Sequence, residues 1–600
     1  MGQYENKVIA STGQDAPGTL GALFESFQPL GIGSDTLQVP SGTQTGGGTD
    51  VLFPDLVFSA RLQLGTGDVL TENNEGIWLY QFNGFTLIAR KGGVVPGVPN
   101  AYFLNDRLPR VFYVPGALGL EAEYSTTGSN DATTTRAFFV TNTSGNLEVI
   151  IAPGMTVLPD VALTQNFLVY AFNGKSVLFS SGLAGGAVNN TNNRGIFIID
   201  VTTKNITTLA RVGDPMPEIT GGFKYDDFFS FNSYNPLNTF GQTIFNITGK
   251  RGPPAEVIGA VFEGFTSGET FLFNNSEIGN PTSVFGDHRL NKAGEIAGLG
   301  LLPTDVTKET MWRTDLTFED ATTIVSEGDA TPGLDGDLFS DFLEFVLYDD
   351  QSIGFLAATE QGQSGIWISD STGLHKVAAT GDQAPGVPNG FNFFRVNNMV
   401  ANPFGQIAFS DLAATATDAI SGAWVGNQNG LLLLTQRGDS VELTDGTLRV
   451  LEDIAVSTPL GFSSRTGQDG HASNFNSSGD LLFTATLAGG GSALILAQPE
   501  GLVVNSTGDA EDSNPEDGLC DTGGDPILGR PECTLRAAIQ EANFRNGKDK
   551  ISFNIPTASE NDPATIVLGS DLPVISESVV VDGTTQEQGK VEITGTQFTG

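Results

Sequence analysis

The residues of this sequence that could carry out catalysis are few and scattered. The three histidines, His288, His375 and His471, lie far apart and form no HExxH pair, so the usual zinc-protease spacing is missing. The sequence also lacks a GxSxG elbow, a phosphate-binding P-loop and a GxGxxG turn between a strand and a helix. Adjacent acids such as Asp226–Asp227 and Asp349–Asp350 would serve a glycosidase only if they faced a partner across a cleft. We therefore predict no catalytic residue and no enzymatic activity.

One acidic stretch could bind a cation. Its members are Asp509, Glu511, Asp512, Asp517 and Asp521. Carboxylate oxygens at this density suit Ca²⁺, but the run from Asp512 to Gly518 has one residue too many for the usual calcium-loop spacing. Calcium is the one cofactor that the sequence suggests, and a solvated acidic loop is the alternative.

The two cysteines, Cys520 and Cys533, favour a disulfide. Closing the loop between them would contribute about 3 kcal/mol in the chain-entropy model. Metal binding or redox chemistry would need a CxxC spacing or nearby histidines, and neither is present. A disulfide in turn predicts an extracellular or cell-surface location.

The charge balance excludes several partners. Asp and Glu total 69 against 29 Lys and Arg, which gives a net charge of −40. Nucleic acids and anionic membrane surfaces bind clustered basic residues, and no basic stripe is present. No stretch is long and apolar enough for membrane insertion. Cations, neutral glycans and surface proteins remain as possible partners, and the acidity itself is typical of a solubilised surface.

The aromatic residues reveal internal repeats. The same three-residue pattern, a small or polar residue, an apolar residue and then Trp, ends at Trp78, Trp312, Trp367 and Trp424. Equivalent places in the other units are assigned to Phe138, Phe197, Val261 and Leu494. The eight positions recur at a mean spacing of about 59 residues, which is typical of repeat architectures.

Each unit is predicted to hold four short strands. Apolar runs alternate with turns rich in Gly, Asn, Asp and Pro, such as Asn402–Gly405 and Gly381–Pro385. No helical apolar period is sustained over 12 residues before Thr534. The expected fold is all-β, a β-propeller of about eight four-stranded blades. A stacked β-solenoid is the alternative, although its rungs are usually shorter.

The segment Asn402 to Phe409 resembles the NxxGxxAF signature of tandem-repeat proteins from bacterial surfaces and secretomes. Asn238 to Phe245 is a close copy, Asn476 to Phe483 has Leu in place of Ala, and Asn291 to Gly298 lacks the final aromatic. The resemblance covers roughly residues 7–498. It implies repeats and an envelope setting, without enzymatic activity.

The first strand predicts how the array closes. Lys7 to Ser11, followed by the turn Gly13–Pro17, matches the last strand and turn of a unit, but nothing before it could supply the other three strands. The last unit, about residues 445–498, has three clear strands. We expect Lys7 to Ser11 to complete that last blade by strand exchange.

The sequence changes character after Gln498. The run from Cys533 to Asn543 resembles the CSLREA-type module of bacterial secreted proteins, with Thr534 for Ser and Ala537 for Glu. The module commonly precedes a parallel β-helix. From the residues themselves, Thr534 can cap a short amphipathic helix that ends near Asn543.

Three later apolar runs read as the first rungs of a parallel β-helix: Ala564 to Leu568, Val574 to Gly583 and Val591 to Gly595. A solenoid needs about three or more repeats for stability. Because a signal peptide is also not recognisable near Met1, the sequence reads as a fragment of a longer secreted protein.

Together these features predict three parts: residues 1–499 as a repeat β-propeller, 500–556 as a capping module with a short helix, and 557–600 as the start of a β-helix. The favoured function is a non-catalytic binding or adhesion protein of the bacterial surface. A polysaccharide hydrolase or lyase with an acidic cleft is the first alternative, and a purely structural repeat protein is the second.

Overall fold

The computed structural model describes most of the chain. The described residues are 4–32, 55–81, 84–95, 98–104, 108–114, 117–127, 134–141, 147–216, 222–227, 237–251, 256–265, 270–274, 288–302, 305–314, 322–403, 405–428, 430–457, 471–476, 479–499, 502–513, 515, 520–524, 527, 532–544, 548–556, 563–576, 578–583, 586 and 590–595.

The strands up to residue 499 form antiparallel sheets of four or five strands, numbered here in chain order. Sheet 1 holds β2 (Phe24–Ile32), β3 (Leu56–Leu62), β4 (Glu75–Gln81) and β5 (Gly84–Arg90), with the short η1 (Thr71–Asn73) between β3 and β4. Sheet 2 holds β6 (Tyr102–Phe103), β7 (Arg110–Val114), β8 (Ala117–Ser125), β9 (Thr135–Thr141) and β10 (Leu147–Ile151). Sheet 3 holds β11 (Thr156–Leu158), β12 (Val161–Phe172), β13 (Ser176–Ala184), β14 (Arg194–Asp200) and β15 (Ile206–Arg211). Sheet 4 holds β16 (Lys224–Asp227), β17 (Gln242–Arg251), β18 (Glu256–Phe265) and β19 (Thr270–Asn274).

The second half of the array continues in the same way. Sheet 5 holds β20 (His288–Leu290), β21 (Ile296–Leu302), β22 (Asp305–Thr314) and β23 (Thr322–Ser326). Sheet 6 holds β24 (Phe339–Leu347), β25 (Ile353–Thr359), β26 (Ser364–Asp370) and β27 (Gly373–Ala379). Sheet 7 holds β28 (Asn392–Phe393), β29 (Val400–Ala401), β30 (Ile407–Ala414), β31 (Ala419–Asn427) and β32 (Gly430–Gln436). Sheet 8 holds β33 (Ser440–Glu442), β34 (Leu448–Ala455), β35 (Leu481–Leu487), β36 (Ser492–Pro499) and, from the start of the chain, β1 (Tyr4–Ser11).

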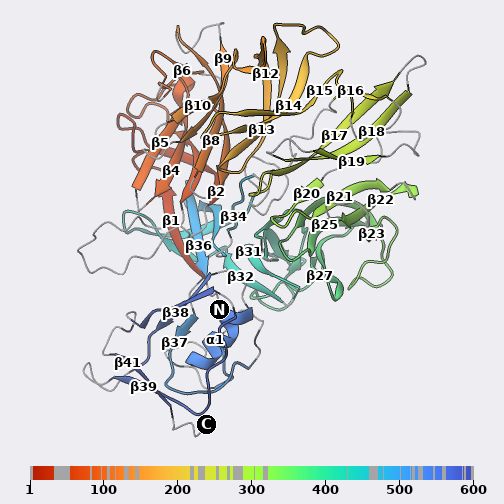
Figure 1. Ribbon diagram of the computed structural model, residues 1–600. Helices are drawn as coiled ribbons and strands as arrows, with labels where there is room; N and C mark the ends of the chain where they lie inside the picture. Colours follow the sequence, from red (N-terminus) through yellow and green to blue (C-terminus); the bar gives the residue numbers. More distant parts are fainter. Residues whose placement is uncertain are drawn as a thin grey trace.

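The sheets follow one another in a β-propeller arrangement (Figure 1), so the expected all-β propeller class is confirmed. Shared apolar clusters join successive sheets: Phe138 of sheet 2 packs with Phe197 of sheet 3, and Ile366 of sheet 6 with Phe409 of sheet 7. This mutual burial is what stabilises stacked repeats that cannot bury both faces alone.

The predicted exchange of the first strand is confirmed. β1 is the outermost strand of sheet 8 and pairs antiparallel with β36, with Val8 opposite Ile495. Ile9 and Ala10 are buried against Leu494 and the aromatic core of sheet 1. The two ends of the repeat array are therefore joined by one sheet and one apolar cluster.

The core of a repeat is a trio of aromatic rings. In sheet 7 the ring of Phe393 meets the edge of Trp424 at 4.9 Å, and Phe409 stacks on Trp424 at 6.0 Å. Phe339, Phe355 and Trp367 reproduce this geometry in sheet 6, and Phe24, Phe58 and Trp78 do so in sheet 1. Edge and offset contacts of this kind add stabilisation beyond the buried area.

Each of these tryptophans also fixes the turn that enters its repeat. The indole N–H of Trp78 donates to the carbonyl of Pro17, that of Trp367 to Pro332 and that of Trp424 to Pro385, at 2.9 to 3.1 Å. The GDxxP turns and the tryptophans recognised in the sequence are thus two halves of one contact. A buried indole N–H needs such an acceptor.

The glycine two residues before Trp gives the ring its space. A methyl group on Gly422 would lie 2.6 Å from the Trp424 ring. We expect Gly422→Ala to lower the free energy of unfolding by about 1–3 kcal/mol, because the ring must shift within a packed core. Thermal unfolding followed by near-UV circular dichroism measures this. Gly430→Ala is the control, since a methyl group there would meet no atom within 4 Å; equal effects of the two variants would contradict the explanation.

Asparagine side chains connect successive repeats at the turns between first and second strands. The side-chain amide of Asn173 donates to the Asn238 carbonyl, Asn238 to the Asn291 carbonyl, and Asn291 to the Tyr348 carbonyl, at 2.7 to 3.2 Å. Asn238 and Asn291 are buried. The asparagine of the NxxG pattern therefore both shapes its own turn and joins one sheet to the next.

Two of the assigned repeat positions are off by one residue. A bulge interrupts the pairing of the third and fourth strands just before the tryptophan, between Ala423 and Trp424 in sheet 7. In sheet 2 the same bulge lies between Phe138 and Phe139, so Phe139 takes the tryptophan place. In sheet 8 Ile495, not Leu494, lies opposite Phe483 and holds that place. The side chain of Val261 lies outside the described residues.

The bulge falls immediately before Phe197 and Trp312 as well. These two residues hold the tryptophan place of sheets 3 and 5.

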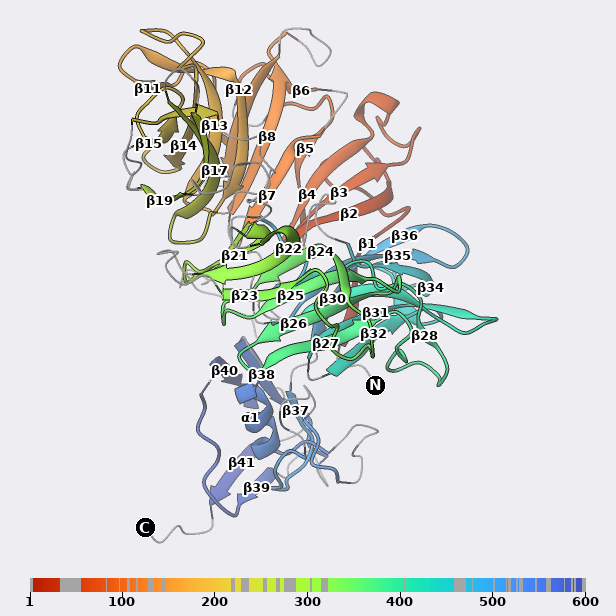
Figure 2. The ribbon, with the colours of Figure 1, turned by 90° about the vertical axis from the view of Figure 1, so that its right-hand side faces the viewer.

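The C-terminal residues form a separate lobe below the array (Figure 2), built from β37 (Leu502–Val504), α1 (Leu535–Phe544), β38 (Lys548–Phe553), β39 (Ala564–Leu568), β40 (Ser578–Val581) and β41 (Val591–Gly595). Its strands pair in parallel, in the orders β37–β38–β40 and β39–β41. The predicted disulfide Cys520–Cys533 is present, and it is buried with α1 in the core of the lobe. Thr534 caps α1 as expected, because its hydroxyl accepts the Ala537 N–H at 3.0 Å.

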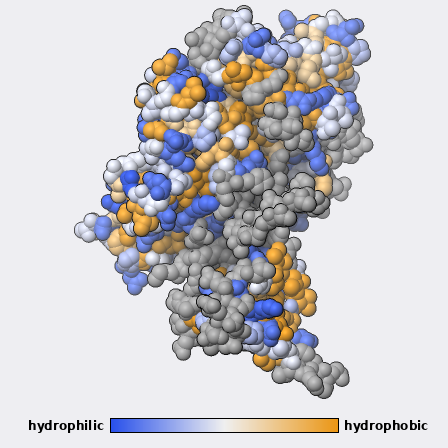
Figure 3. Space-filling model, turned by 90° about the vertical axis from the view of Figure 1, so that its left-hand side faces the viewer, coloured by the Kyte–Doolittle hydropathy of each residue, from blue (hydrophilic) through white to orange (hydrophobic). Residues whose placement is uncertain are grey.

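Apolar side chains gather on one edge of this lobe (Figure 3). The large apolar side chains of the whole lobe that are exposed are Phe544, Val567, Val574, Ile575, Val580, Val581 and Ile593. Among the described residues, no helix is both long enough and apolar enough to cross a membrane.

Candidate functional site

A groove of about 620 Å³ lies between sheet 7 and β34 of sheet 8. The residues lining this interblade groove are Phe394, Arg395, Asn397, Ser410, Asp411, Leu412, Ala419, Ser421, Arg437, Glu452, Asp453 and Ile454. It lies where β30 ends and β31 begins. This is the end of the sheet opposite the asparagine turns, because adjacent turns of an antiparallel meander alternate between its two ends.

An interruption in the first strand of sheet 7 shapes the groove. β28 pairs with β30 over only two residues, and pairing resumes at β29. Between them, the backbone N–H of Arg395 donates to the Asp411 carboxylate at 3.1 Å, and the Asn398 side chain bonds both backbone groups of Ser410. These side-chain hydrogen bonds replace the backbone pairing that is interrupted between β28 and β29. Phe394 lies in this interruption, and 62 % of its surface is exposed.

Asp411 is the most perturbed acid of the groove. Burial raises the pKa of its carboxyl above the ordinary value, and the backbone N–H groups of Leu412, Arg395 and Phe394 only partly oppose this by stabilising the ionised form. Asp453 is held differently, since it accepts the Ser421 hydroxyl at 2.6 Å.

The arginine side chains of the groove make fewer hydrogen bonds and ion pairs than its acidic side chains do. Within the described residues, no hydrogen bond or ion pair occupies the guanidinium group of Arg395 or Arg437, although both residues line the groove. Other arginines are used by the fold: Arg90 binds Asp68 and Arg536 binds Asp509, each at 2.9 Å. The groove therefore presents an exposed aromatic ring beside two guanidinium groups with their donors available.

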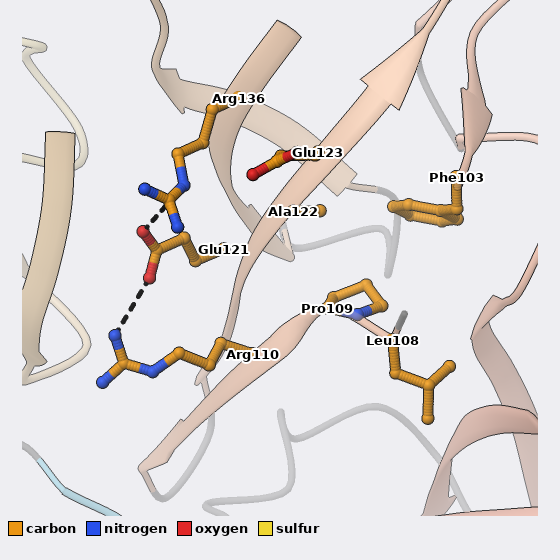
Figure 4. A pocket seen from close by; sticks show the side chains of 8 residues that line it. All are labelled: Phe103, Leu108, Pro109, Arg110, Glu121, Ala122, Glu123 and Arg136. Atoms are coloured by element: carbon orange, nitrogen blue, oxygen red, sulfur yellow. Dashed lines mark hydrogen bonds and ion pairs between the residues drawn. The ribbon is translucent and has the colours of Figure 1, made fainter. Parts of the chain in front are cut away.

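A smaller cavity of about 150 Å³ is lined by residues of sheet 2 and of the loop before β7 (Figure 4). Glu121 lies between Arg110, at 3.1 Å, and Arg136, at 3.3 Å, and its side chain is almost fully buried. Both arginines also donate to carbonyls of sheet 3, Arg110 to Val169 and Arg136 to Phe167. We call this the Arg–Glu–Arg cluster.

Strand register identifies equivalent residues in the linings of the two cavities. Glu121 pairs with Phe138, and Ser410 pairs with Ala423, in both cases the residue just before the bulge. Glu121 and Ser410 therefore hold the same place in the repeat. Counting back two residues along the third strand, Arg136 and Ser421 also correspond. The two positions that Glu121 and Arg136 occupy in sheet 2 are therefore occupied by the smaller Ser410 and Ser421 in sheet 7.

The described members of the predicted calcium set, Asp509, Glu511, Asp512 and Asp521, are not brought together as a cluster. Asp509 instead binds Arg536. Burial opposes ionisation of the Asp509 carboxyl, but the hydrogen bonds from Arg536 and from the Gly569 N–H, together with the Arg536 charge, lower its pKa. Asp512 accepts the backbone N–H of Asp521. No three His, Cys, Asp or Glu side chains in the described part of the chain could hold a metal. Asp517 lies outside the described residues, and calcium binding stays a prediction.

The other acids and histidines singled out in the sequence are dispersed. Asp226 lies 3.9 Å from Lys250, and Asp349 accepts the Lys292 N–H in a turn. His288 is buried against Trp312, whereas His375 is paired with Asp370 at the surface of sheet 6. None of these residues lines the groove.

Solved structures similar to this chain have low sequence identity and low TM-scores. The β-propeller domain of the Trilobed protease from Pyrococcus furiosus is 11% identical, with a TM-score of 0.30, and the match covers 63% of this chain and 92% of that chain. The periplasmic gluconolactonase of Pseudomonas aeruginosa is 11% identical, with a TM-score of 0.24, over 63% and 95% of the two chains. The acylaminoacyl peptidase of Pyrococcus horikoshii is 10% identical, with a TM-score of 0.22, over 58% of this chain and 57% of the peptidase.

No curated protein sequence matches this chain significantly. A family model does match, over residues 57–501, which is most of the chain. The protein therefore belongs to the family of unknown function designated DUF7453.

Proposed function

We propose that this protein is a non-catalytic binding protein of the bacterial cell surface or secretome, and that the interblade groove is its ligand site. The observation that carries the proposal is the composition of the groove: an exposed Phe394 beside Arg395 and Arg437, whose guanidinium groups the fold leaves available. Binding sites combine an apolar surface with a few convergent polar groups in this way. The Cys520–Cys533 disulfide supports an oxidising location.

The finer architecture is part of the proposal. We propose a closed ring of eight blades, because sheet 8 packs through β1 against sheet 1 and the described strands fall into eight antiparallel sheets. A ring of seven would leave one of these sheets outside it. The parallel strands after residue 502, with α1 over one end, support a capping module that begins a β-helix stalk.

The test is binding of the purified chain to an array of immobilised neutral and acidic oligosaccharides. We expect Phe394→Ala to reduce binding about tenfold, since stacking of an aromatic ring is lost. Leu20→Ala is the matched control, because Leu20 is 77 % exposed and lies far from the groove in the sequence. Binding that Phe394→Ala leaves unchanged would contradict the site, and the absence of any binding would favour a purely structural protein.

One observation favours a second candidate, a polysaccharide-degrading enzyme. The Asp411 carboxyl has a raised pKa and shares the groove with exposed Glu452, as a general acid and its partner would. Release of reducing ends or unsaturated products from polysaccharides, abolished by Asp411→Asn, would establish the enzyme and overturn the binding function.

A further inference from the structure

We propose that the interblade groove binds the carboxylate of an acidic sugar, such as a uronic or sialic acid residue, through Arg395 and Arg437, with the sugar ring against Phe394. This inference rests on the proposed binding function and specifies its ligand class.

The Arg–Glu–Arg cluster shows that this fold can hold a carboxylate between two guanidinium groups. Between sheets 2 and 3 the chain places its own carboxylate, that of Glu121, between two guanidinium groups. Between sheets 7 and 8 the corresponding residue is Ser410, and the space is about 620 Å³ rather than about 150 Å³. No carboxylate of the described residues binds the guanidinium groups of Arg395 or Arg437. Arg395 and Arg437 do not hold the places of Arg110 and Arg136, because Ser421 corresponds to Arg136. A ligand carboxylate would instead bind this separate pair of arginines, as the Glu121 carboxylate binds its own pair.

The guanidinium chemistry selects the anion. A planar guanidinium group binds a carboxylate with two parallel hydrogen bonds, and these charge-assisted bonds are among the strongest available. The lining also carries the carboxyl groups of Asp411, Glu452 and Asp453, so attraction for an anion is local to the two guanidinium groups, whereas the net charge of −40 repels a long polyanion.

The remaining lining selects a sugar. Glu452 and Asp453 line the groove as acceptors, so the ligand must donate hydrogen bonds as well as accept them. A saccharide does so with its hydroxyl groups. The carbon face of a pyranose ring also matches Phe394, whose ring is largely exposed at the groove. A glutamate-rich peptide offers carboxylates without the hydroxyl donors.

The test is calorimetric titration with oligosaccharides that carry galacturonate, glucuronate or sialate, each beside its neutral counterpart, and with triglutamate. We expect at least one acidic sugar to bind about tenfold or more tightly than its neutral counterpart. Arg395→Gln and Arg437→Gln should each reduce that affinity about tenfold or more and leave the neutral sugar's affinity unchanged. Arg61→Gln is the control, because Arg61 is an exposed residue of sheet 1 that pairs with Glu75.

The outcomes separate this inference from the proposed function. Binding of neutral sugars without an acidic preference, or unchanged affinity in both arginine variants, overturns the carboxylate site and leaves the binding function standing. Equal binding of triglutamate overturns the assignment to a sugar. Cleavage of any oligosaccharide during the titration overturns the non-catalytic function, and binding of none of the probes overturns both.

Discussion

Deletion of residues 1–11 will open the repeat array and abolish its cooperative thermal transition. β1 contributes Val8, Ile9 and Ala10 to two separate apolar clusters, one shared by sheets 7 and 8 and one shared by sheets 8 and 1. Without it, the edge of β36 and the apolar faces of Leu494 and Leu496 lose their cover. Exposed strand edges of this kind also promote aggregation. Differential scanning calorimetry measures the transition, and small-angle scattering measures the loss of compactness.

A point substitution makes the same test without shortening the chain. Ile9→Asp should lower the free energy of unfolding by about 4 kcal/mol, because an unpaired charge enters a packed core. Leu20→Asp introduces the same charge at an exposed site and should change it by less than about 0.5 kcal/mol. A synthetic peptide of residues 4–11 should restore the transition of the deleted protein. An unaltered transition in the deletion variant would show that β1 does not hold the array closed.

Replacing Glu121 with Ala should lower the free energy of unfolding by about 3 kcal/mol. The substitution leaves Arg110 and Arg136 facing each other at the interface of sheets 2 and 3 without the carboxylate that compensates them, and removal of one member of a buried ionic group is strongly destabilising. Chemical denaturation followed by tryptophan fluorescence measures the change.

The matched control is Glu148→Ala. Glu148 pairs with Lys204 at 3.1 Å, but its side chain is 54 % exposed, so the loss should stay below about 1 kcal/mol. If both variants lose the same amount, the Arg–Glu–Arg cluster has no special role. An increase in stability in Glu121→Ala would mean that desolvation of the carboxyl, which raises its pKa, outweighs the two ion pairs.

The repeats were predictable because a few residue types recur in each of them, and each type has one local structural role. Tryptophan needs the preceding glycine for space and the proline carbonyl as acceptor, so the Gly365–Trp367 pattern and the Gly328–Pro332 turn recur together. The exchange of β1 and the disulfide were predictable for a similar reason. A single strand that carries the turn of a repeat can pair only with a repeat that lacks a strand. Two cysteines can pair only with each other.

The register of each repeat was not predictable to the residue. The bulge before the tryptophan adds a residue to one strand without any glycine or proline to mark it, so Phe138 was assigned where Phe139 belongs. The error has a physical cause, since both phenylalanines are buried, on opposite faces of the strand.

The interblade groove was missed because its residues come from two sheets. Only the packing of sheet 8 against sheet 7 brings Arg395, Arg437 and Glu452 to one place. A signal for the equivalent slot was present: Arg110, Glu121 and Arg136 are charges within otherwise apolar strands of sheet 2. Charged residues on a buried strand face must be paired, which would have pointed to the Arg–Glu–Arg cluster.

The join between β1 and β36 also sets the order in which the protein can be made. Thr12 and Ser492 bond to each other although 480 residues separate them. At about 5–20 residues per second, the first strand waits roughly 25–100 seconds after synthesis before its partner emerges. During that time β36 is not available to pair with β1, and sheet 8 is not available to pack against sheet 1. The array can therefore close only after β36 has emerged, and a chaperone that shields the first strand until then would prevent its pairing with other chains without shortening the wait.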